Sequence, residues 1–270
     1  MKTSLSIRLR AAIFSPAMLI SVLLGLILLL KFHITHYIWY YIKYGAINFS
    51  DMGTTFLNEI FVTDATSGFG LFAPILAVLP ATTLFCDDYN SGYIKPILSR
   101  IEKKRYIKET IFYSTIAGGL AVFVPTFLTD FLMVICFEPN TLENNLGYQT
   151  FLDEGIFANI QFIWGSLLVV FLLLLLSFLF GAVWSNIGLC ISAFIPNKYI
   201  ALATPFALYF SLHLILYKTG SLLLFSPVNM LTAFADFLPC LPYPFIYQGI
   251  LLTAAICIFC WGVKRRLKDV

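Results

Sequence analysis

The feature that most constrains this chain is a series of six apolar stretches in which charged residues are almost absent. A helix needs about 20 apolar residues to cross the hydrocarbon core of a bilayer, whereas a soluble domain keeps roughly a quarter of its residues charged. Here 11% are charged, and the mean hydropathy is +0.88. The alternating pattern of a membrane β-barrel is absent. We therefore predict an all-α polytopic membrane protein, a single domain over residues 1–270, with six transmembrane helices at 17–30, 69–86, 111–137, 162–195, 199–217 and 245–263.

The positions of lysine and arginine predict how these spans are oriented. If the N-terminus is inside, only three of the 17 basic residues fall in outer segments, namely Lys31, Lys43 and Lys218. The inner segments hold Lys2, Arg8, Arg10, Lys95, Arg100, Lys103, Lys104, Arg105, Lys108, Lys198, Lys264, Arg265, Arg266 and Lys268. Because positively charged loops stay in the cytoplasm, we expect a protein of the cell membrane with both termini in the cytoplasm.

The fourth stretch, residues 162–195, is too long for an upright span. At 1.5 Å per residue it would extend roughly 50 Å, against a hydrocarbon core of about 30 Å. A hairpin broken near Gly181 would export the basic C-terminal cluster, so a single helix, tilted or bent at 181–188, is the preferred interpretation. Ser177, Gly181 and Ser185 recur in it every four residues, which predicts a small-residue face for close packing of another helix.

Two further segments are expected to lie against the membrane without crossing it. Near the N-terminus, an apolar helical face precedes Pro16, which favours a helix in the inner interface; topogenic charge is the alternative explanation of the basic residues there. The members of this face are Leu5, Leu9, Ala12 and Ile13. Residues 219–244 are apolar but interrupted by prolines, which favours a re-entrant segment of short helices between the last two spans. An interfacial amphipathic loop is the alternative.

The inner loop between the second and third spans contains a short amphipathic pattern. Its apolar residues Ile94, Ile97, Leu98 and Ile101 recur at helical spacing, and basic residues lie off that face. Pro96 is tolerated in the first turn of a helix. Such a helix either lies on the membrane surface, held by anionic lipid, or docks into a partner.

This loop resembles the corresponding loop of type-2 ABC transporter permeases. The residues that carry the resemblance are Phe85, Asp87-Asp88, Ser91-Gly92, Ile94, Ile97-Leu98-Ser99-Arg100 and Lys103-Lys104-Arg105-Tyr106-Ile107. The order of six spans, with a helix before the first and an apolar outer segment before the last, is similar in outline. This sequence departs from the family in the early position of Pro96 and in the paired aspartates, where a glutamate is commoner.

The resemblance implies the permease subunit of an ATP-driven exporter for a hydrophobic or amphipathic substrate, such as a peptide, an antibiotic or a lipid-like compound. It implies a cytoplasmic coupling helix that contacts a separate ATPase through Asp87, Asp88, Ser91, Gly92, Ile94, Leu98, Arg100 and Ile101. It also implies a dimer of ATPase subunits that uses ATP and Mg²⁺, a second permease chain, identical or a sister subunit, and no cofactor bound by this chain. The sequence has no G-x-x-x-x-G-K-[ST] phosphate loop, so this chain is not expected to hydrolyse ATP itself. A nucleic-acid partner is not indicated.

Two ionisable residues inside the predicted spans form the remaining candidate site. Asp130 and His213 are expected at similar depth, roughly 6–11 Å inside the outer boundary, and a carboxylate at the midplane costs on the order of 3 kcal/mol. We predict that they face each other, within one chain or across two; a protonated or water-facing Asp130 is the alternative. An ion- or proton-coupled carrier and a membrane-embedded enzyme remain the alternative functions. His33 and His36 are expected at the outer interface and not at a metal site.

Overall fold

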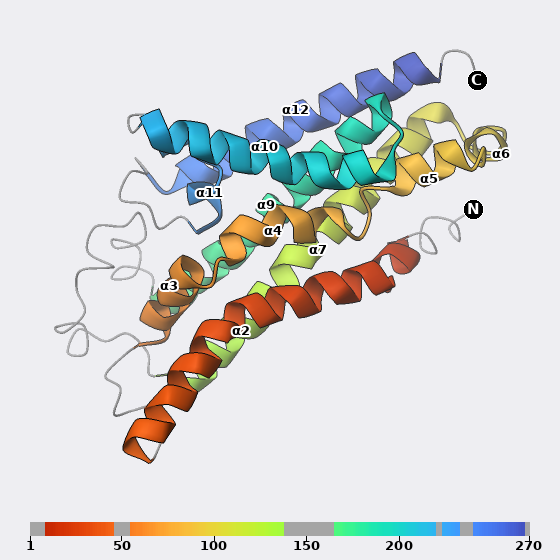
Figure 1. Ribbon diagram of the computed structural model, residues 1–270. Helices are drawn as coiled ribbons and strands as arrows, with labels where there is room; N and C mark the ends of the chain where they lie inside the picture. Colours follow the sequence, from red (N-terminus) through yellow and green to blue (C-terminus); the bar gives the residue numbers. More distant parts are fainter. Residues whose placement is uncertain (1–8, 46–54, 138–164, 220–222, 233–239, 268–270) are drawn as a thin grey trace.

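The protein is a bundle of long helices (Figure 1). The computed structural model describes residues 9–45, 55–137, 165–219, 223–232 and 240–267, which contain helices and no strands. Within these described residues, five helices are long and apolar enough to cross a membrane, and a bent pair of shorter ones supplies a sixth if it counts as one span. The chain is therefore a helical multi-pass membrane protein, and the predicted fold class is confirmed. The elements are α2 (Pro16–Tyr44), α3 (Phe56–Thr66), α4 (Phe69–Val78), α5 (Leu84–Asn90), α6 (Ile94–Leu98), α7 (Lys103–Cys136), α9 (Ser166–Phe194), α10 (Lys198–Thr219), η4 (Leu223–Phe225), α11 (Asn229–Thr232) and α12 (Pro242–Arg266).

The first long helix, α2, extends well beyond the predicted span 17–30. Ser15 caps its start by accepting a hydrogen bond from the backbone N–H of Met18, and Pro16 occupies the first turn. The helix continues through Gly25 and ends at Gly45, which has φ of 74°. Residues 9–13 are also helical and are separated from α2 by a break before Pro16, as the sequence predicts. The beginning of that predicted N-terminal helix, including Leu5, lies outside the described residues.

The second pass is broken, which corrects the prediction of one continuous span at 69–86. The chain forms α3, α4 and α5 in succession, and α3 and α4 meet at an angle of 73°. Gly68, between them, has φ of 70°, a left-handed backbone conformation that residues with a Cβ rarely adopt. A turn over residues 79–83 then separates α4 from α5. Hydropathy detected the apolar part of this pass but not α3, which precedes it.

Helix α9 lies at the centre of the bundle and is continuous through Gly181, so this part of the fourth stretch is a single helix and not a hairpin. It packs against α4, α5, α7, α10, α11 and α12. Against α7 the two backbones nearly touch, since a Cβ added to Gly181 would lie 3.0 Å from the carbonyl carbon of Gly118. The hydroxyls of Ser114 and Ser185 are 2.8 Å apart across this contact. Residues 162–164 of the predicted span lie outside the described residues.

The two ends of the bundle differ in character (Figure 1). One end is formed by α5, α6 and the start of α7, which meet the last turns of α9 and α12. Two hydrogen bonds join these elements. Lys103 donates to the carbonyl oxygen of Leu267, and Arg266 Nε donates to that of Ala193 at 2.8 Å. At the other end η4 and α11 fold back between α10 and α12. Buried Met230 and Leu231 anchor α11 there. Short helices are thus present in the predicted re-entrant segment, of which residues 220–222 and 233–239 lie outside the description.

Candidate functional site

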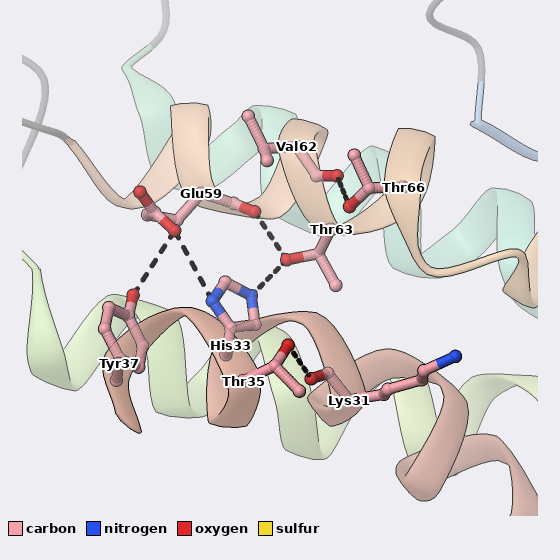
Figure 2. Close-up of polar contacts among 8 residues, drawn as sticks. All are labelled: Lys31, His33, Thr35, Tyr37, Glu59, Val62, Thr63 and Thr66. Atoms are coloured by element: carbon pink, nitrogen blue, oxygen red, sulfur yellow. Dashed lines mark hydrogen bonds and ion pairs between the residues drawn. The ribbon is translucent and has the colours of Figure 1, made fainter. Parts of the chain in front are cut away.

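A buried polar cluster joins α2 to α3 (Figure 2). His33 Nδ1 lies 3.5 Å from Glu59 Oε2, and His33 Nε2 hydrogen-bonds to the hydroxyl of Thr63. The hydroxyl of Tyr37 donates to the same Glu59 oxygen over 3.4 Å. The side chains of His33 and Glu59 are only 4% and 13% exposed. The structure therefore brings the imidazole of His33 and the carboxyl of Glu59 together between two helices. The sequence indicated only that His33 lies at the outer interface.

The helical repeat explains why these side chains meet. His33 and Tyr37 are four residues apart on α2, and Glu59 and Thr63 are four residues apart on α3, so each pair shares one helix face. The imidazole also stacks on the ring of Tyr37, with centroids 5.6 Å apart. Another face of α3 packs against apolar residues of α7 and α9 through Phe56, Leu57, Ile60 and Phe61. Helix α3 thus presents Glu59 and Thr63 to α2 as one polar strip.

Asp130 lies on α7 and is the most deeply buried carboxyl in the described residues, at 4% exposed. Its Oδ2 has no hydrogen-bond partner within the part of the chain that the structure describes. The carboxyl of Asp64, on α3, is close enough to interact with it electrostatically. Helices α3 and α7 therefore each contribute one acidic side chain to this electrostatic interaction.

His213 has a different partner from the one predicted. Its Nδ1 is 2.9 Å from the hydroxyl of Ser226, a fully buried residue in the segment between η4 and α11. No contact joins His213 to Asp130 in the described residues, so within one chain the predicted pair is not formed. A pairing between two chains stays a prediction. The hydrogen bond between His213 and Ser226 holds the segment after η4 against α10.

The residues of the predicted coupling helix lie at the basic end of the bundle. Helix α6 begins at Ile94, which is 3% exposed, and its apolar face packs inward against α5, α9 and α12. Leu98 and Ile101 are partly buried against the same cluster. The apolar face is therefore turned toward this chain's own helices, with Ile94 buried and Leu98 and Ile101 still partly exposed. Contact of these residues with a partner stays a prediction.

The polar residues of the same segment point outward. Asp87, Ser91, Gly92 and Arg100 are exposed, and Gly92, at φ of 72°, makes the turn between α5 and α6. Asp88 is only partly exposed and accepts a hydrogen bond from Tyr106 at 2.9 Å. Any partner that meets this end of the bundle would therefore contact a polar surface.

An open hollow of about 530 Å³ lies beside this surface, where the end of α5 faces the link between α9 and α10. It is lined by Asp87, Asn90, Ser91, Pro196, Asn197, Lys198 and Tyr199. Among the described residues, no three His, Cys, Asp or Glu side chains come together as a metal site would require.

Of the predicted small-residue face, Gly181 and Ser185 lie in the contact with α7, whereas the hydroxyl of Ser177 donates to the carbonyl oxygen of Leu174 in its own helix.

Comparison with known proteins adds no further assignment. No family model, no curated protein and no solved structure matches the chain. The resemblance to type-2 ABC permeases therefore remains a hypothesis that rests on the loop residues.

Sequence reasoning missed Glu59 and Thr63 because it left α3 outside the predicted spans. A signal was present, since Phe56, Leu57, Ile60 and Phe61 recur at helical spacing. The polar residues between them lowered the local hydropathy and hid the helix.

Proposed function

We propose that this multi-pass membrane protein is the permease subunit of an ATP-driven exporter of the type-2 ABC kind. The observation that carries the proposal is the way the segment from α5 to the start of α7 is held. Asn90 Nδ2 donates to the carbonyl oxygen of Pro196 at 2.7 Å, the hydroxyl of Tyr106 donates to Asp88, and Arg266 stacks over the ring of Tyr89 at 5.0 Å. One short segment is thus fixed to α7, to the link that follows α9, and to α12 at once.

This arrangement suits a segment that transmits force. All of these contacts lie within this chain. A force applied to the exposed face of the segment would therefore be transmitted through them to the long helices. In the proposed mechanism an ATPase dimer presses on the exposed polar residues when it closes on ATP and Mg²⁺, and the attached helices tilt. Substrate would move along a path formed with a second permease chain. The basic end would face the cytoplasm, in accord with the distribution of lysine and arginine.

The polar outer face changes which residues are expected to meet the ATPase. Arg100 and the exposed Tyr93 replace the apolar trio as the expected contact residues. The residues Ile94, Leu98 and Ile101 would instead connect the contact surface to the bundle.

The experiment is purification of the chain from its native membrane in mild detergent, followed by measurement of Mg²⁺-dependent ATP hydrolysis that co-elutes with it. We expect ATPase activity in the wild-type preparation and its loss in Arg100→Glu. Lys218→Glu is the matched control, because Lys218 is also an exposed basic residue but lies at the far end of α10. A wild-type preparation without ATPase, or an Arg100→Glu preparation that retains all of it, contradicts the proposal.

A proton-coupled carrier is the second candidate, favoured by the buried His33 and Glu59. Coupled carriers use ionisable groups within the membrane, and the structure contains more of them than hydropathy indicated. Transport that stops when a proton ionophore is added, and continues without ATP, would favour the carrier over the exporter.

A further inference from the structure

The hydrogen bonds around His33 constrain where its protons can be. The hydroxyl of Thr63 has one hydrogen, which it donates to the backbone carbonyl oxygen of Glu59 at 2.6 Å. Its oxygen can then only accept a hydrogen bond from the imidazole, so His33 Nε2 must carry a hydrogen. The other ring nitrogen, Nδ1, faces Glu59 Oε2 at 3.5 Å.

A neutral imidazole with its hydrogen on Nε2 has a lone pair on Nδ1. An ionised Glu59 would therefore set a negative oxygen against that lone pair, in a place where both side chains are largely buried. One additional proton removes the conflict. Placed on Nδ1 it makes an imidazolium–carboxylate pair, and placed on Oε2 it makes a carboxylic acid that donates to the ring. In both placements the pair has no net charge, which lowers the cost of burying it.

We propose that His33 and Glu59 form a proton-binding site, in which the two side chains share one proton between Nδ1 and Oε2. Thr63 fixes the tautomer, and Tyr37 stabilises the carboxyl by donating to it. The proton is the ligand, and the pair binds it as a unit. This inference does not depend on an ATPase partner.

The surroundings favour the bound proton. Both side chains are largely buried, and burial disfavours the net negative charge that the pair would carry if the proton left. Among the described residues, the titratable side chains that interact electrostatically with the cluster are His36 of α2, which acts on His33, and Cys136 of α7, which acts on Tyr37. Asp64 of α3 and Asp130 of α7 interact with each other. The side chain of Lys31 on α2 points away from the pair (Figure 2).

The site also ties protonation to helix position. Glu59 belongs to α3, which ends at the 73° bend, and its contacts with His33 and Tyr37 hold α3 against α2. Loss of the proton would leave the pair with one buried negative charge and weaken this link.

The test reads the protonation state directly in the full chain in lipid nanodiscs at about pH 7.5, where an ordinary exposed histidine is mostly neutral. The chain has three histidines, so ¹⁵N-histidine labelling resolves each ring by NMR once His36→Gln and His213→Gln have assigned the signals. Infrared difference spectroscopy reports whether Glu59 is a carboxylic acid, using Glu59→Gln to identify its band.

We expect either hydrogens on both ring nitrogens of His33 or a protonated Glu59 carboxyl, which amounts to one bound proton per chain. In Glu59→Gln we expect a neutral His33 with one ring hydrogen, because an amide takes up no proton and can donate to Nδ1. His36→Gln is the control and should leave the pair protonated. A wild-type His33 with a single ring hydrogen beside an ionised Glu59 overturns the proposal, and so does a doubly protonated His33 in Glu59→Gln. The wild-type measurement decides the question even if a variant fails to fold.

Discussion

Replacing Gly181 with alanine should push α7 and α9 apart. The added Cβ would lie 3.0 Å from the carbonyl carbon of Gly118, and its oxygen is closer still. Carbon atoms pack best at about 3.5–4.0 Å, so the two helix axes would have to separate by roughly 0.5–1 Å. Backbone atoms cannot rotate away as a side chain can, and the strain therefore falls on the whole contact.

The magnitude follows from three terms. Overpacking a tight contact costs about 1–3 kcal/mol. Lengthening the hydrogen bond between Ser114 and Ser185, now 2.8 Å, adds about 0.6 kcal/mol. Alanine favours a helix over glycine by about 0.8–1 kcal/mol, which offsets part of the loss. The expected net destabilisation is about 0.6–2.8 kcal/mol.

The assay is equilibrium unfolding in mixed micelles, with thermal unfolding in nanodiscs as a second measurement. Gly249→Ala is the matched control, since Gly249 also lies in a long helix but nothing would lie within 4 Å of its added Cβ. That variant should be unchanged or slightly more stable. If Gly181→Ala is as stable as Gly249→Ala, the helices are not in backbone contact and the reasoning is refuted.

Two further substitutions test the basic end of the bundle. Ile94→Asp should lower the free energy of unfolding by more than about 3 kcal/mol, because a carboxylate would enter an apolar cluster. Lys95→Asp, on the exposed side of the same helix, should change it little. Equal effects of the two substitutions in a denaturation series would contradict the inward packing. Arg266→Gln should cost about 1.5–3 kcal/mol by removing charge-assisted hydrogen bonds to the carbonyl groups of Ala193 and Phe194, and the exposed Arg265→Gln serves as its control in the same unfolding measurement.

The long helices could be predicted because membrane insertion imposes a simple composition. A continuous apolar run leaves the chain few choices, and α9 follows that rule through Gly181. The C-terminal end of α2 could not be predicted from hydropathy. Lys31 and His33 lower the hydropathy there, but they do not stop a helix, which continues to the glycine at 45.

The site could not be predicted because its partners are distant in the sequence. His33 and Glu59 are separated by more than twenty residues, and only the packing of α3 on α2 shows that they meet. Similarly, the amphipathic pattern at Ile94 predicts that one face is buried but cannot show what buries it. The structure supplies that answer, which is the chain's own α9 and α12.

The central position of α9 bears on the order in which the bundle can assemble during synthesis. Helices α2 and α7 leave the ribosome before α9 exists, so Gly118 and Ser114 must first face lipid or the insertion machinery. The contact between α2 and α7 needs no later segment, and Gly25 lies there against the ring of Pro125. The contact between α2 and α7 can form as soon as α7 is inserted. The arrival of α9 then covers the exposed face of α7 and provides the surface on which α10 and α12 settle.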